Sequence, residues 1–145
     1  MMKPEIRKVQ REDLEALCAI CSEEMGYPCA QELVEAKVAG LDPDREAVFV
    51  AVSGESGAVG YIHVERYDVL YFETMANILG LAVRSDFQRN GIGKALLSQA
   101  EGWAVEHGIH LMRLNSGISR KGAHAFYRSQ GYIDEKEQLR FTKEV

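Results

Sequence analysis

The sequence contains few cysteines, no long apolar run and no excess of basic residues, and each shortage excludes a class of protein. Three cysteines in 145 residues are too few, and odd in number, for a disulfide framework. No stretch approaches the roughly 20 apolar residues that a membrane-spanning helix requires. The opening segment MMKPEIRKVQ lacks the apolar part of a secretion signal. We therefore expect a soluble, cytoplasmic protein with no membrane partner.

Acidic residues outnumber basic ones, with 22 against 17 and a formal net charge of −5. Binding to a nucleic-acid backbone needs a basic excess, so nucleic acid is not an expected partner. An acidic balance is compatible with attracting small cations such as amines, although solubility alone also selects a charge of this size. The net charge thus excludes one class of partner without choosing another.

Cysteine and histidine show no metal-binding pattern. Cys18 and Cys21 form a CxxC, but no second pair of ligands follows at the spacing of a zinc site. The CxxC also falls inside a helical pattern rather than at a helix N-terminus, where the dipole would activate a thiol. We therefore predict no metal, and we interpret the two cysteines as small apolar residues of a helix.

The chain is long enough to bury one core, with 145 residues of which 46% are hydrophobic, and we predict a single domain over residues 1–145. In the first half of the chain we predict a strand over 5–9, two helices before residue 41 and a hairpin of strands over 47–52 and 59–64. In the second half we predict a strand over 75–83, a helix from 92, a strand over 111–115, a helix over 123–130 and one or two strands over 132–145. Residues 66–74 are expected to form a loop or a strand edge. This order predicts an α/β (α+β) fold whose mixed sheet has one parallel pair of strands.

The segment QRNGIGKALL, residues 88–97, places two glycines at the start of a predicted helix. A helix N-terminus leaves backbone N–H groups unpaired, and its dipole favours anions. Gly91 and Gly93 would leave these groups uncovered, while Arg89 and Lys94 add positive charge. The same glycines would also permit a tight strand-to-helix turn without any ligand. The spacing alone leaves both interpretations open.

Two familiar phosphate-binding loops do not match this segment. The Walker pattern needs four residues between its glycines, whereas a single residue separates Gly91 from Gly93. The dinucleotide pattern G-x-G-x-x-G needs a third glycine where Leu96 stands. Neither nucleotide class is therefore expected, and a small kinase-like phosphate binder becomes the weakest alternative.

Two motifs follow one another along the chain. The first is Gln88-Arg89-Asn90-Gly91-Ile92-Gly93, preceded by the strand LGLAV, and the second is AHAFYRSQGY, residues 123–132. The first resembles the acyl-CoA signature Q/R-x-x-G-x-G/A of the GNAT superfamily of N-acetyltransferases, and the second resembles the helix motif A-x-x-F-Y-x-x-x-G-F/Y of the same family. The order of elements agrees along nearly the whole chain. The resemblance implies a single-domain GNAT fold with a mostly antiparallel sheet of six to seven strands, a splayed parallel central pair and about four helices.

The resemblance also implies a reaction, the direct transfer of an acetyl group from acetyl-CoA to a primary amine of a small molecule or peptide. By position, the pyrophosphate of CoA would bind at Gln88, Arg89, Asn90, Gly91, Ile92, Gly93 and Lys94, and the pantetheine arm along the main chain of Leu81, Ala82 and Val83. A bulge near Gly80 would free an N–H group for the thioester oxygen. Asn115 is a candidate for contact with pantetheine or substrate, or a plain strand-end turn residue. Arg120 stands where many relatives carry asparagine, and would instead meet phosphate.

Acyl transfer to an amine needs a general acid and a general base. Tyr127 matches the family tyrosine that protonates the CoA sulfur, although without the motif it would be an aromatic side chain packed beside Phe126. Glu73 is the first candidate for the base, followed by Asp68 and Glu65, and ordered water can also serve in this superfamily. The alternative function is a GNAT-fold protein that senses acyl-CoA without turnover. No motif indicates the acceptor, and a homodimer is expected because dimers are common in the family.

Overall fold

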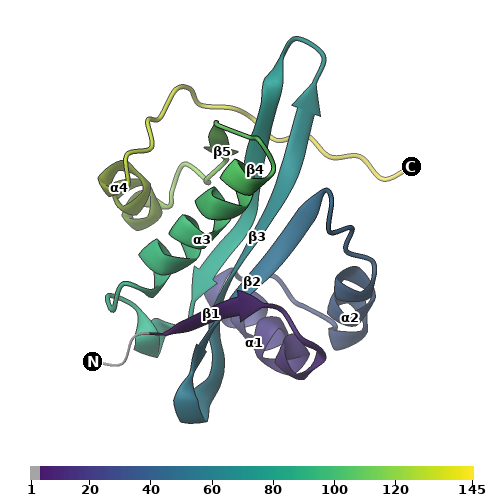
Figure 1. Ribbon diagram of the computed structural model, residues 1–145, viewed down its shortest axis with the longest axis vertical. Coiled ribbons are helices and arrows are strands. Elements are labelled where there is room, and N and C mark those ends of the chain that lie inside the picture. Colours follow the sequence, from purple (N-terminus) through teal and green to yellow (C-terminus); the bar gives the residue numbers. More distant parts are fainter. Residues whose placement is uncertain (1–3) are drawn as a thin grey trace. The chain divides into compact units, whose positions relative to one another are not determined.

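The structure is a computed structural model that describes residues 4–145. The chain divides into two compact units, one ending at Leu114 and one from Asn115 to Val145, and each is described by itself. The first unit contains the sheet and three helices, and the second contains one helix and an irregular tail (Figure 1). No helix among the described residues is long and apolar enough to cross a membrane.

A five-stranded sheet in the order β1-β2-β3-β4-β5 is the frame of the first unit. The strands are β1 (Glu5–Lys8), β2 (Glu46–Ser53), β3 (Gly57–Val69), β4 (Phe72–Val83) and β5 (Met112–Leu114). The helices are α1 (Leu14–Glu24), α2 (Gln31–Ala39) and α3 (Ile92–Glu106), and short 3₁₀ turns occupy Arg11–Asp13, Gly54–Ser56 and Ser85–Phe87. Neighbouring strands run antiparallel except β4 and β5, which are parallel.

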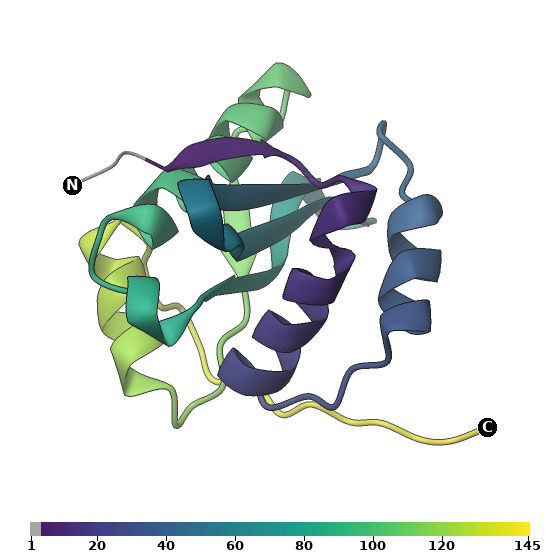
Figure 2. The ribbon, with the colours of Figure 1, turned by 90° about the horizontal axis from the view of Figure 1, so that it is seen from below.

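Helices cover both faces of this sheet, with α3 on one face and α1 and α2 on the other (Figure 2). The buried side of α3 is apolar at helical spacing and consists of Ile92, Leu96, Leu97, Ala100, Trp103 and Ala104. On the opposite face, α1 buries Leu14, Leu17 and Ile20. In contrast, α2 buries none of its nine described residues. The core therefore depends on α1 and α3, and α2 covers the sheet without contributing a buried side chain.

The strand count differs from the prediction, because residues 132–145 form no strand in the structure. Ile133, Leu139 and Phe141 in this tail are 83–85% exposed, so its weak alternation buries no apolar face. The predicted six to seven strands are therefore wrong, and the sheet has five. For the same reason the parallel pair β4–β5 lies at the edge of the described sheet rather than at its centre.

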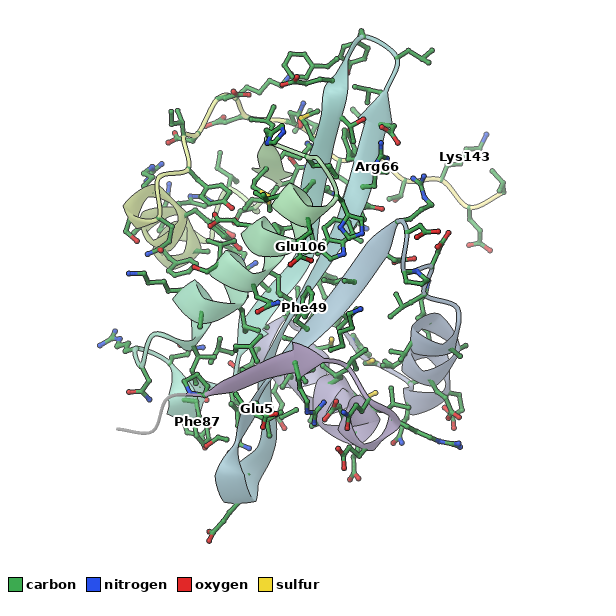
Figure 3. The ribbon with its side chains drawn as sticks, in the orientation of Figure 1. Glu5, Phe49, Arg66, Phe87, Glu106 and Lys143 are labelled. Carbon is green, nitrogen blue, oxygen red and sulfur yellow. The ribbon has the colours of Figure 1, made fainter. Side chains whose placement is uncertain are left out.

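Residues 66–74, expected as a loop or a strand edge, form the end of a long hairpin of strands. The pairing of β3 with β4 continues to Val69 opposite Phe72, whereas the pairing of β2 with β3 ends at Glu65. Beyond that pair, from Arg66 onward, the hairpin projects past the end of β2 (Figures 1 and 3). Its tip has no sheet face to bury, and this is why the apolar residues there do not alternate in sequence.

The other predicted elements are confirmed. The structure contains the two early helices, the β2–β3 hairpin, the β4–α3–β5 crossover and a helix α4 (Lys121–Ser129) in the second unit. The helix α4 ends where the sequence predicts, because Gly131 follows it with φ +90°, a conformation that favours glycine.

Two glycines near the end of α3 predict opposite effects on stability. Gly102 lies in the exposed part of α3, and nothing lies within 4 Å of the place where a Cβ would stand. Gly102→Ala should therefore raise the free energy of unfolding by about 0.5–1 kcal/mol, because alanine favours the helix. Gly108 is equally open but has φ +72°, so Gly108→Ala should lower it by about 1 kcal/mol. Urea denaturation followed by circular dichroism measures both, and the same sign for the two variants would contradict the described backbone.

Candidate functional site

The glycine turn at the start of α3 has the backbone of an anion-binding site. Arg89 and Gly91 both lie in the left-handed region, with φ +67° and +78°. Gly91 is the N-cap of α3, no side chain caps this end of the helix, and its first turn contains no acidic residue. The first N–H groups of α3 are therefore not covered by a capping side chain, and an anion at this end would satisfy them.

The side chains of the turn divide into exposed residues and residues that hold the loop. Arg89 and Lys94 are exposed, so their positive charges are accessible to a ligand. Gln88 Nε2 donates to the carbonyl of Val83 at 2.9 Å, and this bond fixes the entry of the loop. Ile92 is only 4% exposed and packs in the core, so among the predicted pyrophosphate residues it offers only its backbone.

Strand β4 has a bulge directly before Gly80, as the sequence predicts. Ile78 pairs with Val64 and Gly80 pairs with His63, which leaves Leu79 without a partner on β3. The parallel pairing with β5 also ends at Ile78, opposite Leu114. From Leu79 to Val83, β4 thus has a described strand neighbour on one side only, and no strand pairs with the backbone groups on its other side.

Glycine suits position 80 because the Tyr61 side chain lies against it. A Cβ at Gly80 would stand 2.6 Å from Tyr61 Oη, closer than nonbonded atoms allow. The hydroxyl donates to Met25 Sδ at 3.0 Å and accepts from Cys21 Sγ at 3.6 Å. Burial, together with the hydrogen bond from Cys21, raises the pKa of Tyr61, so the phenol stays protonated.

A polar network connects three strands on the face of the sheet that α1 and α2 cover. Asn77, only 8% exposed, donates from Nδ2 to Glu65 Oε2 at 2.9 Å and accepts from Arg113 Nη1 at 2.8 Å. The Arg113 guanidinium also lies over the Tyr67 ring, 4.3 Å from its centroid. Because arginine only donates, it fixes the Asn77 oxygen toward itself and the amide nitrogen toward Glu65. The sequence signal for this network is a single polar residue inside the apolar run MANILGLAV.

The three carboxylates predicted as the base occupy very different places. Glu73 is the second residue of β4 and is exposed, about 20 Å along the strand from the bulge at roughly 3.3 Å per residue. Asp68 is exposed and accepts a hydrogen bond from Thr74, which together with Arg66 lowers its pKa. Glu65 is half-buried and is oriented by Asn77. Of the three, Glu65 lies nearest the bulge along the sheet, because its partner Asn77 stands one residue before Ile78.

The second unit contains the remaining predicted site residues. Tyr127 lies on α4, half-buried, with its ring 5.3 Å from that of Phe126 and 5.9 Å from that of Tyr132 between centroids. Burial raises the pKa of Tyr127 and the charge of Arg120 partly opposes this shift, so the phenol is a proton donor at neutral pH. Arg120 is the N-cap of α4, and Asn115 directly follows β5; both are exposed.

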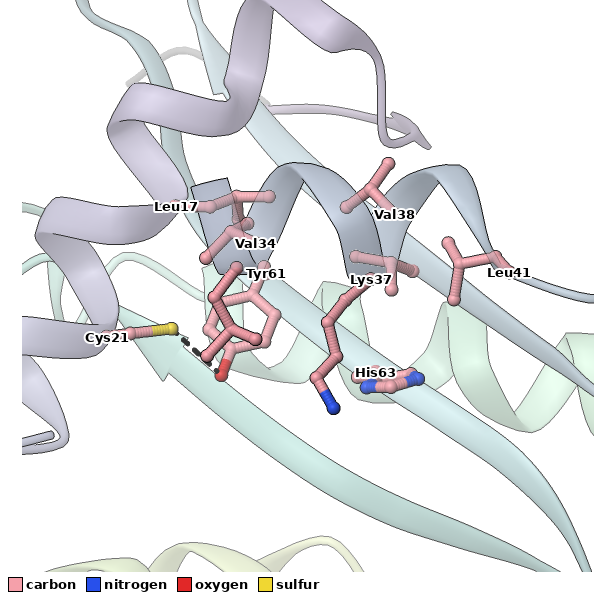
Figure 4. A pocket seen from close by; sticks show the side chains of 10 residues that line it. Leu17, Cys21, Val34, Lys37, Val38, Leu41, Tyr61 and His63 are labelled. Atoms are coloured by element: carbon pink, nitrogen blue, oxygen red, sulfur yellow. Dashed lines mark hydrogen bonds between the residues drawn. The ribbon is translucent and has the colours of Figure 1, made fainter. Parts of the chain in front are cut away.

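A pocket of about 230 Å³ lies on the α1–α2 face of the first unit (Figure 4). Its lining residues are Leu17, Cys21, Leu33, Val34, Lys37, Val38, Leu41, Val48, Tyr61 and His63. Cys21 and Tyr61 stand together at one end, joined by their hydrogen bond. His63, also in the lining, contacts Glu46 Oε1 through Nε2 at 2.8 Å. No motif in the sequence indicates this pocket, because its residues come from four separate segments.

Comparison with known proteins gives a family and a set of relatives. The profile of the acetyltransferase (GNAT) family matches residues 11–132. The chain is 27% identical to an aminoalkylphosphonate N-acetyltransferase of Salmonella typhimurium, over 96% of this chain and 90% of the relative. It is 25% identical to an aminoglycoside N(6')-acetyltransferase type 1 of Stenotrophomonas maltophilia, over 79% and 78%.

A solved structure supports the fold. AAC(6')-Iy, in complex with the bisubstrate analogue CoA-S-monomethyl-acetylneamine, superposes with a TM-score of 0.85 over 99% of this chain and 100% of that one. The sequences are 16% identical, so this likeness concerns the fold alone.

The close approach of Tyr61 to Gly80 predicts an energetic coupling between the two residues. Gly80→Ala should lower the free energy of unfolding by roughly 1–3 kcal/mol, because the new methyl group would collide with the Tyr61 hydroxyl. Tyr61→Phe removes that hydroxyl, and in this background the cost of Gly80→Ala should fall by at least about 0.5 kcal/mol. A double-mutant cycle by urea denaturation measures the coupling. An equal cost of Gly80→Ala in both backgrounds would show that the ring does not contact the bulge.

Proposed function

We propose that this chain, which belongs to the acetyltransferase (GNAT) family, transfers an acetyl group from acetyl-CoA to a primary amine of a small molecule. The observation that carries the proposal is the bulge at Leu79, where pairing with β5 ends and β4 leads directly into the glycine turn. The segment from β4 to α3 thus offers both a backbone edge that no strand pairs with, for an acyl chain, and a helix N-terminus for a phosphate.

The residues present fit CoA. The uncapped N-terminus of α3, with Arg89 and Lys94 exposed beside it, suits the pyrophosphate. The main chain of Leu81, Ala82 and Val83 suits the pantetheine amides, because amides can pair with an edge strand. Acetyl-CoA, when bound, supplies the activated acetyl group. An N–H group at the bulge would stabilise negative charge on the thioester oxygen, a contribution of roughly 3–4 kcal/mol in comparable sites.

The acceptor amine must lose a proton before it attacks, and Glu65 is the carboxylate best placed to take it. Its half-buried position and the hydrogen bond from Asn77 hold one oxygen in place, while the other can face a ligand or a water. Glu73, the first candidate from the sequence, is separated from the bulge by most of the strand. We therefore assign the base to Glu65, acting directly or through a water.

Tyr127 is proposed to donate a proton to the departing sulfur of CoA. Its burial keeps the phenol protonated, and the match to the family motif supports this role. The family profile covers residues 11–132, which include β4, the glycine turn and α4.

Two conservative substitutions test these roles. Thiol release from acetyl-CoA with a panel of primary amines measures turnover. Tyr127→Phe and Glu65→Gln should each lower kcat by roughly 100-fold, because each removes one proton transfer. The pKa of Tyr127 is raised above the ordinary tyrosine value of about 10. The phenol therefore stays protonated up to that pH, and the wild-type rate should not fall as the pH rises toward it.

Matched variants control for nonspecific effects. Tyr71→Phe makes the same chemical change at an 87% exposed position, and Glu73→Gln makes the same change at the first candidate from the sequence. Both should leave kcat within about twofold of wild type. Full activity in Tyr127→Phe would contradict the assignment of Tyr127 as the general acid. A large loss in Glu73→Gln with none in Glu65→Gln would reverse the assignment of the base.

A further inference from the structure

We propose that the pocket beneath α2 holds the body of the acceptor, and that the acceptor is a primary amine with a compact apolar body, such as an aryl ring on a short chain. This inference rests on the proposed transferase function and adds to it the class of substrate. The reacting amine would lie at the Tyr61 end of the pocket, beside the bulge of β4, and its apolar part would lie between α2 and the sheet.

The lining of the pocket is apolar. Seven of the ten lining residues are leucine, valine or cysteine in its thiol form, and none is a carboxylate. The tyrosine presents its ring, because its hydroxyl is engaged with Met25 and Cys21. The imidazole of His63 is held by Glu46. A ligand here gains free energy mainly by removing apolar surface from water.

The pocket is connected to the proposed reaction centre through β3. Tyr61 lines the pocket and its hydroxyl lies against Gly80, while His63, two residues along β3, is the backbone partner of Gly80. Glu65, a further two residues along, points to the same face of the sheet. The pocket, the bulge and the proposed base therefore share one face and one stretch of β3.

Helix α2 has an apolar side that the protein covers only in part, since Val34 packs against the core cluster of Leu17, Val50 and Ala58. Leu33, Val34 and Val38 all line the pocket, yet no described residue of α2 is buried and Leu33 remains 55% exposed. Apolar side chains that face a pocket without being buried contribute little to the free energy of folding. An apolar ligand would cover these side chains and give α2 the packing that the protein lacks.

Size and charge restrict the class of amine. A cavity of about 150 Å³ lined by aliphatic side chains can bind benzene, so about 230 Å³ suits a ring with a short chain. An aminoglycoside carries several ammonium groups and many hydroxyls, which need acidic and polar partners. This lining offers no carboxylate, and its exposed charged side chain is the cation Lys37.

Three amines test the class. We expect kcat/KM for 2-phenylethylamine to exceed that for methylamine by at least about tenfold, because only the former buries a ring. The aminoglycoside sisomicin should be the poorest of the three. A preference for sisomicin, or equal values for 2-phenylethylamine and methylamine, would overturn the inference while leaving the transferase function intact.

Two tryptophan variants of α2 locate the effect. Leu33→Trp fills the pocket from a position that is not part of the core, and should lower the ratio of kcat/KM for 2-phenylethylamine to that for methylamine by at least about fivefold. Ala36→Trp adds the same bulk to the same helix at an exposed residue outside the lining, and should leave this ratio unchanged. An equal effect of both variants on this ratio would overturn the placement of the ligand.

Direct binding separates failure of this inference from failure of the proposed function. Nuclear magnetic resonance of the intact protein with 2-phenylethylamine should shift the amides of β3 and α2 in the wild type but not in Leu33→Trp. If that pattern appears and no amine is acetylated, the transferase proposal fails and the apolar-amine site stands. If amines are acetylated and 2-phenylethylamine shifts no amide of α2, the pocket inference fails and the transferase proposal stands.

Discussion

The contact between Tyr61 and Gly80 is the constraint on which the proposed site depends. Because the phenol lies against the backbone of β4, a residue larger than glycine beside the register shift would displace the Tyr61 side chain. The shift leaves Leu79 unpaired and coincides with the end of the pairing with β5. A single aromatic side chain on β3 thereby connects the edge of β4 that has no strand neighbour to the pocket on the α1–α2 face.

The two faces of the sheet differ in their functional groups, and β4 contributes to both faces. On one face, the apolar side of α3 anchors the helix in the core while its N-terminus remains uncapped and free of acidic residues, which suits an anion. On the other face, the network of Glu65, Asn77 and Arg113 replaces apolar packing with fixed hydrogen bonds. A buried polar network is stabilising only when its members are paired, and it fixes the orientation of a side chain that could act as a base.

The sequence predicts those features that depend on residues close together in the chain. The glycine turn, the bulge near Gly80 and the helices follow from backbone freedom and apolar spacing, and the structure confirms their conformations. The prediction of strands over 132–145 is wrong because alternating apolar residues form a strand only where a neighbouring strand pairs with them. The sequence favours Glu73 because this residue directly precedes the predicted strand, whereas strand register pairs Glu65 with Asn77 and so brings Glu65 nearest the bulge of the three carboxylates. The pocket was missed for the same reason, since strand register and helix placement assemble it from distant segments.

The most direct test of the central claim is an amide-resolved nuclear magnetic resonance titration of the wild-type protein with acetyl-CoA. The account predicts that the largest shifts fall on the backbone of residues 89–94 and 79–83, because these N–H groups would meet the pyrophosphate and the pantetheine arm. Saturable binding that leaves both segments unchanged, or no binding at all, would contradict the claim that β4 and the start of α3 form the CoA site.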